Sequence, residues 1–337
     1  MTTGFVAFVF LVALAATLGS SELLVWGVGR LGLKLGLAAG LVGLLTALGA
    51  DSPEIASALS AILSGAHQVG VGVVLGSNLF NLAALLGLPG VLMGRIVVRR
   101  VVPVVDGTAS LLLTLLAAGL VTGRLSAGAA LVPAAAVLVI YVALLSLRPR
   151  GIRGLRLPRA ITRSLTLLSG QIHPETMVEA PMRAVKGWLP VWLILPALVV
   201  IVAGSVVMVT TALLLGEHWH IPPVILGTVV LAAITSLPNL YAAIRLGQRG
   251  EGATLVSEAL NSNTLNLVAG LGLPSIIVGT GALLSVASSG SLVWLTGLTL
   301  VAVAITILRN GLTRIGGIVI IAGYAGFLFF LLKSAVS

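Results

Sequence analysis

Two acidic residues, Asp51 and Glu54, stand in the middle of a long apolar segment of the chain. Because they are three residues apart, a helical backbone would place both carboxylates on one face. Pro53 lies between them, and a proline inside a helix removes a backbone hydrogen bond and frees a carbonyl oxygen. Carboxylates and free carbonyls are hard oxygen ligands, suited to Na⁺ or Ca²⁺ rather than to soft metals. The segment is therefore predicted to bind cations.

A second polar segment repeats this pattern later in the chain. When the sequence is compared with itself at an offset of 185 residues, GADSPE at 49–54 falls without a gap on ITSLPN at 234–239. Thr235, Ser236 and Asn239 then stand at the depth of the two acids. Their hydroxyl, amide and backbone oxygens are candidate ligands for the same cation.

The same offset aligns two further polar motifs, GSNLFN at 76–81 and NSNTLN at 261–266. Within each motif a serine and an asparagine are four residues apart and share one helix face. These candidate ligands are Ser77 and Asn81 in the first motif and Ser262 and Asn266 in the second. Asn78 and Asn263 point away from this stripe, where they either join helices by hydrogen bonds or add ligands.

The elements that must position these residues are membrane helices. The chain is 58% hydrophobic and 8% charged, against about 25% charged residues in soluble domains, so a soluble enzyme, a nucleic-acid binder and a disordered chain are excluded. The first apolar run lacks a preceding basic stretch and a clear cleavage site, so we expect a membrane helix rather than a signal peptide. Ten spans are predicted near residues 4–27, 36–63, 68–90, 102–121, 126–147, 189–215, 222–244, 252–272, 289–308 and 314–333.

The basic residues predict the orientation of these spans. With ten helices and the N-terminus outside, all of the 19 Lys and Arg except Arg124 and Lys333 fall on the inner side, as the positive-inside rule requires. Both termini are then outside. The basic segment 148–188 becomes a cytoplasmic linker, for which attraction to anionic lipids is an alternative role.

The repeat divides the chain into two halves. We expect a first five-helix repeat at 1–147, with its motif at 42–90, and a second at 189–337, with its motif at 227–275. Because five is odd, the second repeat must enter the membrane from the opposite side. Inverted repeats are typical of secondary transporters, which bind their substrate near the membrane midplane. A duplicated bundle without transport is the alternative, and the polar residues inside the repeats argue against it.

The charge of the two acids supports a transported cation. A carboxylate at the bilayer centre costs about 2.5–3.5 kcal/mol on insertion scales, and no Lys or Arg lies in the middle of any predicted span. An intramembrane enzyme is the rival interpretation. Aspartyl chemistry would need acids on facing helices and a zinc enzyme an HExxH helix, and neither is present, so no enzymatic activity is expected.

These paired motifs resemble the two α-repeats of the sodium/calcium exchanger family, within the calcium/cation antiporter superfamily. The family pattern is G-T-S-x-P-E followed by G-S-N-x-x-N, or a variant ending in Asp, once in each half. The resemblance implies that the first and sixth spans slide across a fixed core. It also implies cation coordination by Glu54, Ser77, Asn81, Thr235, Ser236, Ser262 and Asn266.

Two departures from the family pattern bear on the charge of the site. Asn239 stands where the family has its second glutamate, and Ala50 and Asp51 replace the Thr-Ser of the first motif. The lost acid thus returns one turn before Glu54, and two carboxylates remain. Two like charges so close together favour a protonated state, which makes coupling to protons more credible than in a standard exchanger.

The sequence therefore predicts an antiporter that exchanges Na⁺ (or H⁺) against Ca²⁺ by alternating access. The alternatives are a proton- or sodium-coupled exchanger of monovalent or other divalent cations, and a non-transporting membrane scaffold. We expect a prokaryotic-type plasma membrane, no cofactor beyond the transported ions, no nucleic acid and no obligate protein partner. Glu22 and Glu258 are candidate access-path or gating residues, with helix packing and an interfacial position as their alternatives. Asp106, which follows Arg99 and Arg100, is expected to form an interfacial ion pair.

Overall fold

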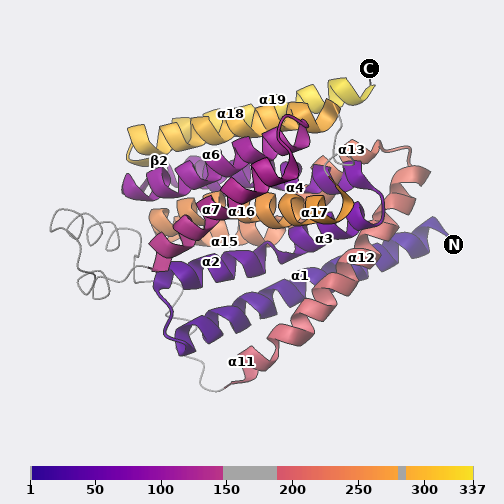
Figure 1. The fold of residues 1–337 in the computed structure, drawn as a ribbon, viewed down its shortest axis with the longest axis horizontal. Coiled ribbons are helices and arrows are strands. Elements are labelled where there is room, and N and C mark those ends of the chain that lie inside the picture. The colour runs from indigo at the N-terminus through magenta and orange to yellow at the C-terminus, as the bar shows by residue number, and fades with distance from the viewer. Residues whose placement is uncertain (1, 147–187, 280–285, 337) are drawn as a thin grey trace.

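The computed structural model describes residues 2–146, 188–279 and 286–336, which form a bundle of helices (Figure 1). The first half consists of α1 (Thr3–Lys34), α2 (Ala39–Ala50), α3 (Ser52–Leu63), α4 (His67–Asn81), the π-helix η1 (Leu82–Gly87), α5 (Leu88–Met93), β1 (Arg95–Val97), α6 (Val101–Val121) and α7 (Ala127–Ser146).

The second half follows a similar order. It consists of α11 (Leu189–Trp192), α12 (Ile194–His218), α13 (Pro223–Ile225), the π-helix η2 (Leu226–Leu231), α14 (Ala232–Thr235), α15 (Leu237–Gln248), α16 (Gly252–Leu265), the π-helix η3 (Asn266–Gly272), α17 (Leu273–Val278), α18 (Val286–Leu308), β2 (Gly311–Thr313) and α19 (Arg314–Val336).

Seven helices of the described residues are long and apolar enough to cross a membrane, and a pair bent by 47° at 223–248 raises the number to eight. Two of the ten predicted spans are not among them. Span 36–63 is divided into α2 and α3, of 12 residues each. Span 252–272 runs through α16 and η3, where the polar motif lowers the hydropathy. The helices also exceed the predicted limits, since α1 continues to Lys34.

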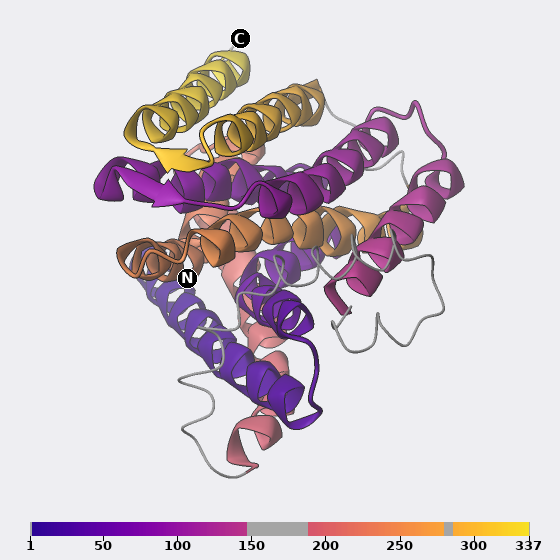
Figure 2. The ribbon, with the colours of Figure 1, turned by 90° about the vertical axis from the view of Figure 1, so that its left-hand side faces the viewer.

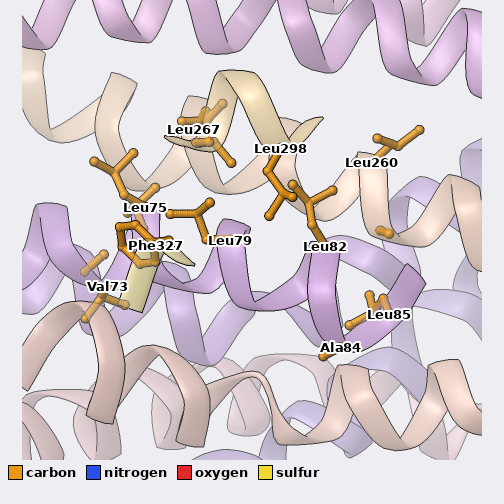
Figure 3. Packing of buried hydrophobic residues seen from close by; sticks show 14 of the residues in the cluster. Val73, Leu75, Leu79, Leu82, Ala84, Leu85, Leu260, Leu267, Leu298 and Phe327 are labelled. Atoms are coloured by element: carbon orange, nitrogen blue, oxygen red, sulfur yellow. The ribbon is translucent and has the colours of Figure 1, made fainter. Parts of the chain in front are cut away.

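The helices that carry the polar motifs form the centre of the molecule. In the segment from α4 through α5, 94% of the residues in the most apolar 18-residue stretch are buried. Its leucines, Leu75, Leu79, Leu82 and Leu85, pack among side chains of α16, η3, α18 and α19 (Figure 3). Close approach is set by glycine, because a β-carbon on Gly76 would overlap the backbone of Thr228 in η2. Two of the predicted ligands, Ser77 and Asn81, therefore stand on a helix that is buried on nearly all sides.

Two long helices lie outside this core. α1 and α12 pack along each other on one side of the bundle (Figure 1, Figure 2). A glycine allows the contact, because a β-carbon on Gly204 of α12 would come within 2.3 Å of Thr17 Oγ1 of α1. The α1–α12 pair is the counterpart of the first and sixth predicted spans.

A short antiparallel ribbon joins the two halves at one end. β1 pairs with β2, with Arg95 opposite Thr313 and Val97 opposite Gly311. The Arg100 Nε donates to Asn310 Oδ1 beside the ribbon, at 2.6 Å. Sequence patterns missed this ribbon because three-residue strands carry too little alternation to be recognised. The start of α1 and the end of α19 lie at the opposite end from β2 (Figure 1).

Candidate cation-binding site

Breaks in two helices bring polar groups into the centre of the bundle. Asp51 separates α2 from α3, and Ser236 separates α14 from α15, which bend by 47°. Proline follows each break within the first turn, where its missing N–H is tolerated. Pro53 leaves the Gly49 carbonyl without its helical donor, and this oxygen accepts from Ser52 Oγ at 2.6 Å and from Ser21 Oγ of α1 at 2.9 Å.

The two acids of the first half meet the polar residues of the second. Asp51 and Glu54 are each 1% exposed. Ser236 Oγ donates to Glu54 Oε1 at 2.6 Å. Asn239 Nδ2 lies 2.8 Å from Asp51 Oδ1 and 3.2 Å from Glu54 Oε1, so one amide donates to both carboxylates.

The stripes on α4 and α16 complete the cluster. Ser262 Oγ donates to Asp51 Oδ1 at 2.8 Å and accepts from Asn81 Nδ2 at 2.8 Å. Asn266 Nδ2 donates to Glu54 Oε2 at 2.5 Å. Ser77 belongs to the same group, because its hydroxyl lies near the Glu54 carboxylate. We call these residues the central cluster, which comprises Asp51, Glu54, Ser77, Asn81, Ser236, Asn239, Ser262 and Asn266.

Thr235 and Asn78 make hydrogen bonds that the spacing of the motifs did not specify. The Thr235 hydroxyl donates to the Leu231 carbonyl within its own helix at 2.8 Å, so it makes no hydrogen bond to the acids. Asn78 instead joins the network, because its Oδ1 accepts from Asn266 at 3.1 Å and its Nδ2 donates to the Asn263 carbonyl at 3.3 Å. The repeated motif was the signal that could have included Asn78. The argument from helix faces left Asn78 open between joining helices and adding a ligand, because it considered one helix and not the partner across the interface. The bond to the Asn263 carbonyl joins the two helices.

The remaining acids lie outside the central cluster. Glu22 is exposed on α1. Glu258 is partly buried one turn before Ser262, near enough for its charge to act on Asp51. The predicted interfacial ion pair of Asp106 is wrong: Asp106 is 2% exposed and accepts from Tyr141 at 2.8 Å. The reason is that α6 begins at Val101, which turns Asp106 toward α7 and α16.

Unpaired oxygens surround the two carboxylates. Five buried oxygen atoms of the central cluster accept no hydrogen bond: Asp51 Oδ2, Ser77 Oγ, Asn81 Oδ1, Asn239 Oδ1 and Asn266 Oδ1. Among the described residues, every hydrogen-bond donor to Asp51 and Glu54 is a serine or an asparagine, so neither acid is paired with a basic side chain. Isolated buried charges cost several kcal/mol each. Carboxylate, amide and hydroxyl oxygens so arranged are suited to Na⁺ or Ca²⁺.

Comparison with known proteins decides the family. The model of the family described as "Sodium/calcium exchanger protein" matches residues 5–148 and 189–333. The chain belongs to the sodium/calcium exchanger family. Members of this family are membrane cation antiporters and not enzymes, which confirms the predicted class and the resemblance of the paired motifs. The two matched stretches also confirm two repeat halves in a multi-pass membrane protein.

Two relatives cover most of the chain. "Inner membrane protein YrbG" of Escherichia coli is 28% identical over 277 residues, which cover 79% of this exchanger-family chain and 78% of that protein. "Putative antiporter CaxA" of Alkalimonas amylolytica is 25% identical over 334 residues, which cover 96% and 98%.

Two solved structures share the fold. The H⁺/Ca²⁺ exchanger CAX aligns with a TM-score of 0.72 at 16% identity, over 96% of this chain and 82% of that one. The sodium-calcium exchanger NCX_Mj, soaked with zero Na⁺ and Ca²⁺, aligns with a TM-score of 0.61 at 19% identity, over 98% and 100%. At these identities the likeness establishes the fold alone.

Proposed function

We propose that this chain is a secondary active antiporter that exchanges Na⁺ or H⁺ against Ca²⁺, with the ions bound in the central cluster. The observation that carries the proposal is the pair of buried carboxylates, Asp51 and Glu54. Asp51 Oδ2 and four oxygens of neighbouring side chains are unpaired, and neither acid has a basic partner among the described residues. Two carboxylates balance one Ca²⁺ or two monovalent cations. Carboxylates and neutral oxygens are the ligands that Ca²⁺ takes in proteins.

The donors on the second half suggest how the site holds its charge between ions. Asn239 and Asn266 each direct Nδ2 at a carboxylate, while their Oδ1 atoms remain unpaired. A bound cation replaces these donors, and rotation of either amide presents Oδ1 to the cation in place of Nδ2. The amide hydrogen bonds thus compensate the carboxylates in part when no cation is bound.

The choice between Na⁺ and H⁺ depends on the unusual position of the acids. Both carboxylates belong to the first half, and one amide of the second half, that of Asn239, donates to both. Asn239 also takes the place of the second-repeat glutamate implied by the family pattern. We infer that Asp51 replaces that acid. Because like charges this close favour proton uptake, protons can act as the counter-ion. The same asymmetry favours an exchanger of monovalent or other divalent cations as the second candidate.

The proposed topology has ten spans in two inverted five-helix repeats, at 1–147 and 189–337, with a cytoplasmic linker at 148–188. The divided helix α2–α3 and the continuous α16–η3–α17 supply the two spans that length and hydropathy do not reveal. The start of α1 and the end of α19 lie at the same end of the bundle, which is compatible with both termini outside (Figure 1). The Escherichia coli relative is an inner membrane protein, which supports a plasma membrane location.

Alternating access is proposed to involve the α1–α12 pair. These helices pack on each other, and α1 also packs on α2 and α12 on α3. The Ser21 hydroxyl of α1 donates to the broken backbone of α2 at Gly49, at 2.9 Å. Glu22 is the next residue, exposed on α1, and Glu258 lies one turn before Ser262. We propose that these two acids line the routes by which cations reach the central cluster.

Transport by the purified chain in proteoliposomes tests the function. Ca²⁺ uptake is measured under an outward Na⁺ gradient and, separately, under an outward proton gradient, with Glu54→Gln as the inactive variant. Uptake driven by either gradient and lost in Glu54→Gln is the expected result, and the gradient that drives it identifies the counter-ion. If neither gradient drives uptake, Ca²⁺ exchange is wrong, and uptake of other cations under the same gradients then tests the second candidate.

A further inference from the structure

A second buried polar cluster lies apart from the central cluster, where α6, α7 and α16 meet. Asp106 of α6 and Tyr141 of α7 are each 2% exposed, and Asn261 of α16 is 5% exposed. The Tyr141 hydroxyl donates to Asp106 Oδ1 at 2.8 Å and is also directed at Asn261 Oδ1. Asn261 Nδ2 donates to Ser257 Oγ at 3.3 Å. The Ser257 hydroxyl in turn lies near the Asp106 carboxylate and interacts with it. The four side chains therefore form a closed ring, which we call the Asp106 ring.

The number of protons in the Asp106 ring depends on the state of Asp106. Tyr141 has one hydroxyl proton, yet both Asp106 and Asn261 present acceptor oxygens to it. If Asp106 is protonated, it donates to Tyr141, which donates to Asn261, and every member of the ring has a partner. If Asp106 is ionised, rotation of the Asn261 amide lets Nδ2 donate to Tyr141, which then donates to Asp106. The orientation of an amide is assigned from its hydrogen bonds, so the same ring accepts either state.

Few other titratable side chains lie on the described elements that pack against α6. α6 packs against α7, α16, η3 and α18. Besides Asp106 itself, the titratable side chains of those elements are Tyr141 on α7 and Glu258 on α16, and the described parts of η3 and α18 have none. Apolar residues close the ring from the side of α2 and α7, where Tyr141 packs with Leu44, Ala47, Ala109 and Leu145. One turn after Asp106, Ser110 is fully buried and its hydroxyl has no partner. In the part of the chain that the structure describes, the region thus holds an acid and an unpaired hydroxyl and no basic group to neutralise the acid.

The Asp106 ring occurs in one half only. At the 185-residue offset, Ser257 and Asn261 fall on Gly72 and Gly76. Those glycines serve close packing, since a β-carbon on Gly72 would lie 2.8 Å from Thr228 Oγ1. The counterpart elements α18 and α19 carry no acid in the described residues. A packing requirement common to both repeats therefore does not explain the ring.

We propose that the Asp106 ring is a second, proton-binding site, distinct from the central cluster, that takes up and releases one proton at the Asp106 carboxylate. On release, the O–H bond of Asp106 breaks and the proton leaves to water. The Asn261 amide rotates, the hydrogen bonds among Asp106, Tyr141, Asn261 and Ser257 reverse direction, and no other covalent bond changes. Asn261 precedes Ser262 on α16 and follows Glu258 by three residues. Rotation of Asn261 therefore acts on the helix that donates Ser262 to Asp51. This effect on exchange rests on the proposed function, whereas proton binding does not.

Infrared difference spectroscopy of the full-length chain tests proton binding directly. Wild type and Asp106→Asn are compared from mildly acidic to mildly alkaline pH, because an amide at this position would reproduce the hydrogen bonds of the protonated ring. We expect the difference spectrum to contain the carbonyl band of a protonated acid at low pH and a carboxylate band at high pH. Tyr141→Phe should shift that titration. Thr114→Val is the control, because the Thr114 hydroxyl donates only within its own helix, to the Ser110 carbonyl oxygen, at 2.7 Å. A carboxyl that keeps one state across this range overturns the proposal.

A transport measurement separates the ring from the central cluster. Energetic coupling between two sites typically changes affinity about 5–150-fold. We therefore expect Asp106→Asn to lower the ratio of the exchange rates at mildly alkaline and mildly acidic pH toward one, by about fivefold or more. The exchange rate at low pH should stay at the wild-type level. An unchanged pH profile overturns the coupling to exchange. If the wild type transports no cation but Asp106 still titrates, the ring stands and the proposed function fails.

Discussion

The two halves of the molecule agree in their serine–asparagine stripes and differ on the adjacent faces of the same helices. Ser77 and Asn81 on α4 match Ser262 on α16 and Asn266 at the start of η3, and both pairs lie in the central cluster. One residue before each serine, α4 has Gly76, against the backbone of η2, where α16 has Asn261, bonded to Tyr141. The duplicated fold keeps the residues that face the central cluster, while adjacent buried faces of the same helices take different partners.

The halves also divide the chemistry of the central cluster. The first half contributes the charged acceptors Asp51 and Glu54, and the second contributes the donors Ser236, Asn239 and Ser262. A site built from two matching halves would place one acid on each. Here both acids follow one helix break, so the negative charge lies on one side of the interface between the halves.

The largest effect is expected from Glu54→Gln. This change removes one of the two carboxylates proposed to bind Ca²⁺. Removing one partner of a buried pair of opposite charges typically costs about 3–5 kcal/mol. Ca²⁺ affinity should therefore fall on the order of a hundredfold or more, measured by calorimetric titration and by uptake into proteoliposomes. Glu217→Gln, an exposed acid on α12, is the control and should bind as wild type. Retained affinity in Glu54→Gln would remove this acid from the site.

The next prediction returns an acid to the second half. Asp51→Ser alone removes one of the two carboxylates of the central cluster. It should reduce the exchange rate at least about tenfold, which corresponds to about 1.4 kcal/mol. Adding Asn239→Glu should recover part of the rate. The Asn239 side chain lies against both Asp51 and Glu54, so a glutamate there returns the second carboxylate to the same cluster. Full transport by Asp51→Ser alone would show that Asp51 does not replace the missing glutamate.

A smaller effect is expected at the contact between α4 and η2. Gly76→Ala should destabilise the protein by about 1–3 kcal/mol, the usual cost of overpacking, because its β-carbon would overlap Thr228. The matched change is Gly43→Ala on α2, the position that corresponds to Thr228. A β-carbon there meets nothing within 4 Å, so this change should be neutral or stabilise by up to about 1 kcal/mol. Thermal unfolding in detergent measures both, and equal midpoints would contradict the difference between the halves.

The smallest effect concerns the contact between α1 and the core. Ser21→Ala removes the hydroxyl that donates to the Gly49 carbonyl at 2.9 Å, while Ser52 still donates to that oxygen. The loss of one such hydrogen bond is worth about 1 kcal/mol, so the exchange rate should change less than about tenfold. Thr210→Val is the control, since Thr210 bonds only within α12. A complete loss of transport in Ser21→Ala would give Ser21 a direct role at the cation.

Much of the central cluster could be predicted because its residue types are unusual where they stand. An acid or an asparagine in an apolar run is conspicuous, and the repeated spacing marked eight residues that the structure brings together. The side-chain roles were less accessible. The Thr235 hydroxyl is used by its own helix, and Asn78 reaches across to Asn266, because hydroxyl rotamers and interhelical contacts depend on neighbours that periodicity does not describe.

The sequence by itself determined the class of the protein, the apolar runs, the two repeats and the excess of acid on the first half, because composition, hydropathy and motif spacing are local properties. Only the tertiary structure decided which groups meet. The hydrogen bonds to Asp51 and Glu54 come from residues 182 to 212 positions away. It also placed Asp106 beside Tyr141 and Asn261 rather than beside its neighbouring arginines. Such pairings depend on how far helices rotate and how closely they pack, and glycines such as Gly72 and Gly76 set that distance.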